Sequence, residues 1–186
     1  MRTEKPLEVT VRPRGPAFVL KFAQDLIPLF EGTNRIDAVA TAEGLTLHCL
    51  WERDLEWAEE KIRGTFSDDL LWGKPQVKLL PGEVAGRAVF LEPMLKIHVH
   101  TPEEFSGIVM GDLSGRRGMI TGMDDVSAQK LIHAQVPLSE LIGYSSWLAK
   151  TTNGEASAVA EFDSYQEAPK GQGPDPSEPM SAALRA

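Results

Sequence analysis

The sequence has little cysteine, no long hydrophobic run and no excess of basic residues. Its single cysteine, Cys49, cannot form an internal disulfide, which favours a reducing compartment. No stretch approaches the roughly 20 apolar residues of a membrane-spanning helix, and charges interrupt the apolar residues near the N-terminus, so we expect neither a signal peptide nor a membrane partner. We therefore expect a cytoplasmic protein.

The charge balance limits the class of nucleic-acid-binding protein. Lys and Arg number 19 against 27 Asp and Glu, which gives a net charge of −8 over 186 residues. Affinity for a nucleic-acid backbone rests on neutralising phosphates, so a broad basic face is excluded and we expect no DNA partner. Half of the acidic excess lies after residue 154. The charge balance therefore does not exclude a local RNA contact in residues 1–154, which are nearly neutral.

The hydrophobic pattern repeats itself once along the chain. In the first half, apolar alternation indicates strands near 7–12, 36–40, 45–49 and 74–80, and 3.6-residue stripes indicate helices at 19–27 and 54–66. In the second half, the same patterns give strands near 95–100, 119–128, 130–137 and 156–162, with helices after Pro102 and from Ser139. Each half therefore reads βαββαβ.

This order predicts an α+β fold of two ferredoxin-like βαββαβ sandwiches in tandem. Each would be an antiparallel sheet with helices on one face and the other face open. We expect units at residues 1–80 and 93–165, a linker at 81–92, and a disordered Pro- and Gly-rich tail at 166–186.

Catalytic motifs are scarce in this chain. It lacks the G-x-x-x-x-G-K-[ST] loop of P-loop nucleotide hydrolases, and Cys49 lies in a predicted strand, where a small core residue is the simpler interpretation. His98 and His100 share one strand face, and His133 lies on the strand predicted to pair beside it. These imidazoles could hold zinc, but no carboxylate or cysteine is placed to complete the ligand set. We expect no cofactor and no enzyme activity.

Two further groups of residues are candidates for contacts with a partner. Arg116 and Arg117 follow the second unit's first helix and are bounded by glycines, an arrangement that suits phosphate contact or an ordinary solvated loop. Tyr144 could stack on a base or cover the core. Trp51 and Trp57 lie off the apolar stripe of their helix, so they are candidates either for a protein contact or for packing between the units.

The second half resembles the C-terminal domain (domain V) of elongation factor G. The resemblance is carried in order by Leu91–Ile97, Thr101–Glu104, Gly111–Gly118, Gly122–Met123, Val136–Leu138, Leu141–Tyr144 and Thr151–Ala156. The first half is similar to domain III of the same factors at Pro6–Pro13 and Gly73–Val77. It departs at Leu50–Arg53, where the family has Gly-Met-Gly-Glu.

The resemblance implies binding to the factor site of the large ribosomal subunit, where domain V of the family docks on RNA and proteins. The GTPase domain, the barrel after it and domain IV have no counterpart in this sequence, so GTP hydrolysis is not implied. The motif match includes Arg116 and Arg117, and it implies either an RNA-facing or a structural role for them. The alternatives are a protein-interaction module, as a dimer or the partner of a separate translational GTPase, a small metal-dependent enzyme built on His98, His100 and His133, and a decaying remnant.

Overall fold

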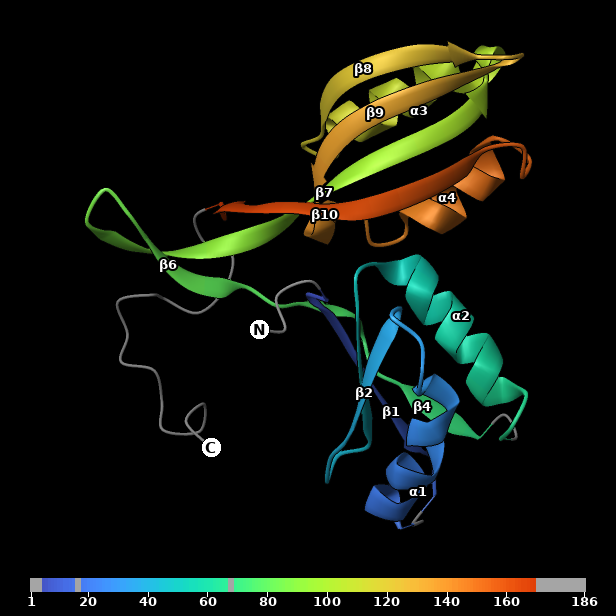
Figure 1. The fold of residues 1–186 in the computed structure, drawn as a ribbon, viewed down its shortest axis with the longest axis vertical. Coiled ribbons are helices and arrows are strands. Elements are labelled where there is room, and N and C mark those ends of the chain that lie inside the picture. Colours follow the sequence, from blue (N-terminus) through green and yellow to red (C-terminus); the bar gives the residue numbers. More distant parts are fainter. Residues whose placement is uncertain (1–4, 16–17, 67–68, 170–186) are drawn as a thin grey trace.

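The structure is a computed structural model that describes residues 5–15, 18–66 and 69–169. Two α+β units follow one another along the chain, each with an antiparallel sheet and two α-helices (Figure 1). The fold class predicted from the sequence is thereby confirmed. The predicted tail lies outside the described residues from 170 onward, whereas residues 166 and 167 end a strand. Among the described residues, no helix has the length and apolarity needed to cross a membrane.

The first unit has the strand order expected of a ferredoxin-like sheet, β2-β3-β1-β4. Its elements are β1 (Leu7–Pro13), α1 (Val19–Leu26), the 3-10 helix η1 (Ile27–Phe30), β2 (Ile36–Ala40), β3 (Leu45–Cys49), α2 (Glu52–Arg63), β4 (Leu70–Trp72) and β5 (Gln76–Val77). Alternation places Leu7, Val9 and Val11 in the core. Helix α1 gives way to η1 just before Pro28, whose ring cannot continue an α-helix.

The fourth strand of this unit differs from the expected single strand at 74–80. Both β4 and β5 pair with β1, and they are separated by Gly73 and Pro75. Gly73 lies so close to the β1 backbone that a Cβ there would meet the Thr10 carbonyl oxygen at 3.1 Å. Pro75 has no N–H to give to a ladder. The strand is therefore broken into two short pieces.

The second unit repeats the fold with the order β10-β7-β9-β8. Its elements are β6 (Leu80–Val84), β7 (Arg87–Pro102), α3 (Glu103–Gly115), β8 (Met119–Val126), β9 (Gln129–Pro137), the 3-10 helix η2 (Leu138–Glu140), α4 (Tyr144–Thr151) and β10 (Ser157–Glu167). The expected helix from Ser139 is instead η2 followed by α4, because Gly143 adopts the left-handed conformation (φ 82°) between them.

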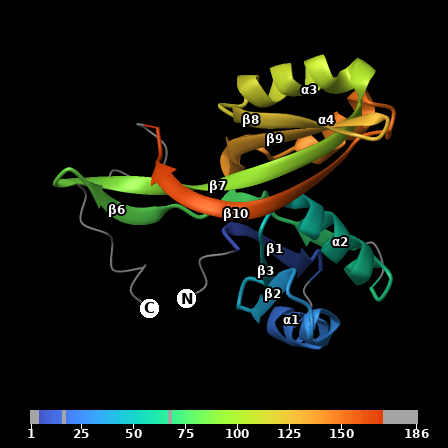
Figure 2. The same cartoon turned by 45° about the horizontal axis from the view of Figure 1, so that its top comes forward.

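Residues 81–92, expected to be a linker, form a β-hairpin. Strands β6 and β7 pair from Leu80–Leu91 to Val84–Arg87. Ala85 and Gly86 both have positive φ (51° and 76°), as a two-residue type I′ turn requires. Strand β10 pairs with β7 from His100 back to Leu91, where the hairpin begins. The result is a two-stranded arm that extends away from both units, with the end of β10 at its base (Figure 2).

Candidate functional site

The loop that carries Arg116 and Arg117 closes helix α3 in a Schellman-like turn. The Gly118 N–H donates to the Leu113 carbonyl at 2.9 Å, and Arg117 takes the left-handed position with φ 57°. That position is usually occupied by glycine, because the left-handed conformation costs a residue with a Cβ about 1 kcal/mol of conformational free energy. Gly118 is required for another reason, since a Cβ on it would meet the Leu113 oxygen at 2.4 Å. Strain at Arg117 therefore needs an offsetting interaction.

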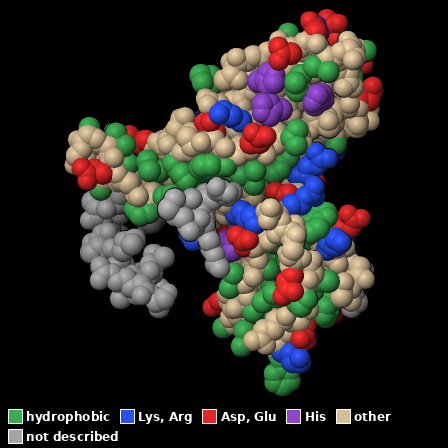
Figure 3. Space-filling model, viewed as in Figure 1, with side chains coloured by type: hydrophobic (Ala, Val, Ile, Leu, Met, Phe, Trp, Pro, Cys, Tyr) green, Lys and Arg blue, Asp and Glu red, His purple; other side chains and the backbone are tan. Residues whose placement is uncertain are grey.

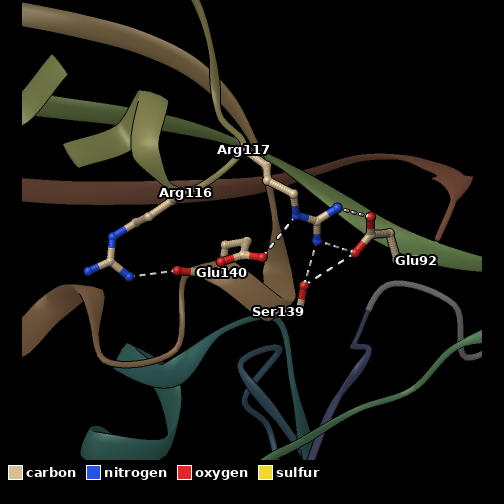
Figure 4. Close-up of polar contacts among 5 residues, drawn as sticks. All are labelled: Glu92, Arg116, Arg117, Ser139 and Glu140. Atoms are coloured by element: carbon tan, nitrogen blue, oxygen red, sulfur yellow. Dashed lines mark hydrogen bonds and ion pairs between the residues drawn. The ribbon is translucent and has the colours of Figure 1, made fainter. Parts of the chain in front are cut away.

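The Arg117 side chain supplies that interaction by binding two glutamates. Its two terminal nitrogens donate to the two carboxylate oxygens of Glu92 at 2.8 and 2.9 Å, and its Nε donates to Glu140 at 2.9 Å (Figure 4). Ser139 Oγ also bonds Glu92, at 3.2 Å. Only 3 % of the Glu92 side chain is exposed. The hydrogen bond to Glu92 is the main cause that raises the pKa of Arg117.

Arg116 is held within the same unit by different groups. Its Nε donates to Asp112 at 2.6 Å, and a terminal nitrogen donates to the Glu140 carbonyl at 2.7 Å. The guanidinium also lies over the rings of Tyr144 and Trp147, 5.3 and 5.8 Å from their centroids. Both arginines therefore hold the end of α3 against η2, and Arg117 also ties it to β7. Of the two roles left open by the sequence, this geometry favours the structural one.

Tyr144 has the packing of a core residue. It is fully buried, it stacks on Trp147 at 5.7 Å, and burial is the main cause that raises its pKa. Its hydroxyl is one of two buried side-chain polar atoms without a hydrogen-bond partner in the described part of the chain. A base could not stack on this ring without opening the unit.

Tyr144→Phe is expected to raise the free energy of unfolding by about 1 kcal/mol, because it removes a buried hydroxyl that has lost its bonds to water. Urea denaturation of the two proteins measures the difference. Trp147→Phe, in the neighbouring ring, is the matched control and is expected to be destabilising. A Tyr144→Phe protein less stable than wild type would mean that the hydroxyl has a partner in solution.

The three histidines lie on the open face of the second sheet. His98 and His133 are directly opposed in β7 and β9, with their Nδ1 atoms 2.6 Å apart, while His100 is opposite Leu131. His133 Nε2 is 2.9 Å from Asp124 Oδ2. Two nitrogens that bind one tetrahedral zinc ion lie roughly 3.3 Å apart. The His98 and His133 nitrogens are closer than that, at the distance of a direct hydrogen bond between the two rings. No group of three or more His, Cys, Asp or Glu in the described ranges is arranged to hold a metal ion.

The two candidate tryptophans pack within the molecule. Trp51 is 5 % exposed and precedes α2 at the border between the units. Trp57 packs edge-on against Phe30, with Arg35 and Lys61 over its ring. Trp51 lies where packing between the units is predicted, whereas Trp57 packs within the first unit. Cys49 is also buried, and burial raises the pKa of its thiol, as expected of a core residue.

The start of α2 joins the two units through polar contacts that sequence patterns do not indicate. The Glu52 carboxylate accepts hydrogen bonds from the backbone N–H groups of Gly143 and Ser145 at 2.5 and 2.6 Å, at the N-terminus of α4. Arg53 donates to the Ala158 carbonyl on β10 at 2.6 Å. A carboxylate at a helix N-terminus is favoured by the helix dipole. Glu52 therefore caps a helix of the other unit.

The observed sheet orders define a tandem ferredoxin-like α+β protein whose second unit carries a glycine-bounded arginine turn. Residues 89–173, slightly less than half of the chain, match the family model described as elongation factor G C-terminus. This match includes nearly all of β7 and every later element of the second unit, through β10. The resemblance of the second half to the elongation factor G C-terminal domain is therefore confirmed over residues 89–173.

A solved structure extends the likeness to both units. The crystal structure of ttk003000868 from Thermus thermophilus superposes with a TM-score of 0.62 and 18 % sequence identity over 90 % of this chain. At that identity the likeness establishes the fold. The matched region is 41 % of the Thermus protein, so this chain corresponds to less than half of its length.

Proposed function

We propose that this chain is a non-catalytic, translation-factor-like protein that binds the factor site of the large ribosomal subunit through its second unit. The supporting observation is the elongation factor G C-terminus match at residues 89–173, which takes in that unit from β7 to β10. In this proposal the arm at 81–92 stands where the family has domain IV. The non-catalytic part rests on the sequence, which has no nucleotide-hydrolysing loop.

Co-sedimentation of the full chain with ribosomes through a sucrose cushion tests this function. We expect the protein to pellet with ribosomes at low salt and to be released as salt rises, because contacts with ribosomal RNA release counterions. Elongation factor G added in excess is expected to displace it if both use the factor site. A protein that stays in the supernatant at low salt would refute ribosome binding. Binding that excess elongation factor G leaves unchanged would place the contact elsewhere.

The alternative of a protein-interaction module now has less support. Its motivating residues, Trp51 and Trp57, are packed against the protein itself. What still favours it is the pair of open sheet faces. Recovery of a translational GTPase with the tagged chain from nuclease-treated lysate, together with no binding to ribosomes, would favour this alternative.

A further inference from the structure

A cleft of about 720 Å³ lies between the two units, below β10. It is lined on the first unit by the segment before β1, the turn before β2 and the residues around the start of α2, and on the second unit by β10. The lining residues are Lys5, Asn34, Arg35, Leu50, Trp51, Arg53, Asp54, Val159, Ala160 and Phe162. Both units contribute, so the cleft exists only in their assembled arrangement.

The cleft is basic although the protein is acidic. Lys5, Arg35 and Arg53 line it, against Asp54 as the one carboxylate in the lining. Lys and Arg side chains are seen at this junction in Figure 3. Because the whole chain carries −8, a cleft with more basic than acidic side chains is a local reversal of the protein's charge.

The cations of the cleft keep capacity to bind an anion. One terminal nitrogen of Arg53 donates a hydrogen bond to the Ala158 carbonyl. This contact holds the guanidinium at the border between the units and leaves its positive charge unpaired by any carboxylate in the described part of the chain. Arg35 lies 5.6 Å from the Trp57 ring centroid. Lys5 is paired with Asp37 at 2.8 Å and contributes less. This differs from Arg116 and Arg117, each of which is already bound to a carboxylate.

We propose that this cleft binds the phosphate backbone of single-stranded RNA, with Arg35 and Arg53 as the phosphate contacts. A guanidinium binds two phosphate oxygens at once. The apolar wall formed by Leu50, Val159 and Phe162 suits unstacked bases, which are exposed in single-stranded RNA. Val159 is 56 % exposed. Only the ribosomal origin of this RNA rests on the proposed function. The affinity of the cleft for RNA follows from its charged and apolar side chains.

Binding of a fluorescein-labelled, unstructured RNA of about 12 nucleotides to the full chain, followed by fluorescence anisotropy, tests the proposal. Arg35→Gln/Arg53→Gln is expected to weaken binding at least about tenfold, the loss of two charged contacts, and to lower the slope of log affinity against log salt by about 2. Arg12→Gln/Arg14→Gln removes the same charge from exposed positions outside the cleft and is expected to change affinity less than about twofold.

Asp54→Asn supplies a test of opposite sign. It removes the carboxylate of the cleft while keeping its size, so RNA binding is expected to tighten. The Arg35→Gln single variant leaves the Arg53 contact with Ala158 intact, which separates lost phosphate binding from lost contact between the units. Equal weakening by both double variants, or no tightening by Asp54→Asn, would overturn the proposal. So would equally tight binding of a poly-glutamate peptide or of inorganic phosphate.

The outcome is separable from the ribosome test. Ribosome binding that persists in Arg35→Gln/Arg53→Gln, with RNA affinity also unchanged, refutes the cleft and leaves the proposed function standing. RNA binding that depends on the cleft, in a protein that does not pellet with ribosomes, supports the cleft and refutes the proposed function.

Discussion

Arg117→Ala is expected to lower the free energy of unfolding by about 3 kcal/mol, the low end of the cost of breaking a buried ion pair. The change leaves the Glu92 carboxylate, 3 % exposed, without its two-nitrogen partner. Ser139 Oγ is the hydrogen-bond partner that remains to it. Because about a third of the Arg117 side chain is exposed, water can reach the vacated space, which argues against the high end of the range.

Urea denaturation with a series of variants separates the ion pair from the backbone strain. Arg117→Gly loses the same contacts but relieves the left-handed backbone at φ 57°, so it is expected to be about 1 kcal/mol more stable than Arg117→Ala. Arg117→Ala/Glu92→Gln is expected to recover part of the loss, since no charge is left buried. Arg12→Ala, at an exposed position, is the control and is expected to lie within about 0.5 kcal/mol of wild type.

An Arg117→Ala protein as stable as the Arg12→Ala control would show that Glu92 is solvated in solution. The expected loss also changes how a ribosome assay should be interpreted. Loss of ribosome binding on removal of Arg116 and Arg117 would report a loosened second unit as readily as a lost RNA contact. The Arg35→Gln single variant of the cleft does not share this difficulty, because Arg35 has no ion pair within the described contacts and the Arg53 contact with Ala158 stays intact.

Sequence patterns are sufficient to predict the fold because both units obey simple periodicities. Burial alternates along β1 and β9 as predicted, and the two sheets have the strand order of the predicted topology. The predicted element boundaries are wrong where a glycine or proline is compatible with more than one local structure, such as a linker, a tight turn or a break between helices. The pattern places Gly86 in a linker, yet this residue closes a hairpin. It places Gly143 inside a helix, yet this residue separates η2 from α4.

The partners of the candidate residues could not be predicted, because they are distant in sequence. Arg117 meets Glu92 across 25 positions, and Glu52 meets Gly143 across 91. Neither strand alternation nor helix periodicity states which side chains of different elements will meet. The glycine-bounded pattern correctly places Arg116 and Arg117 in a loop. It cannot distinguish an arginine that is free to bind phosphate from one that is already bound to carboxylates of the same chain.

Glu52→Ala is expected to lower the free energy of unfolding by about 2 kcal/mol and to loosen the contact between the units. Two charge-assisted hydrogen bonds from the α4 N-terminus are lost, together with a favourable interaction with the helix dipole. The Gly143 and Ser145 amides would then face the border between the units with no acceptor. Hydrogen exchange is expected to show faster exchange at Ser145 and along the first turn of α4.

The control for this variant is Glu60→Ala, an exposed glutamate on the same helix, expected to lie within about 0.5 kcal/mol of wild type. Calorimetry adds a readout of coupling. If Glu52 joins the units, its removal should broaden the thermal unfolding transition or split it in two, because the two units then unfold less cooperatively. A single, unchanged transition with unaltered exchange at α4 would mean that the buried apolar border alone couples them. In that case the cleft, which needs both units in place, would not depend on Glu52 either.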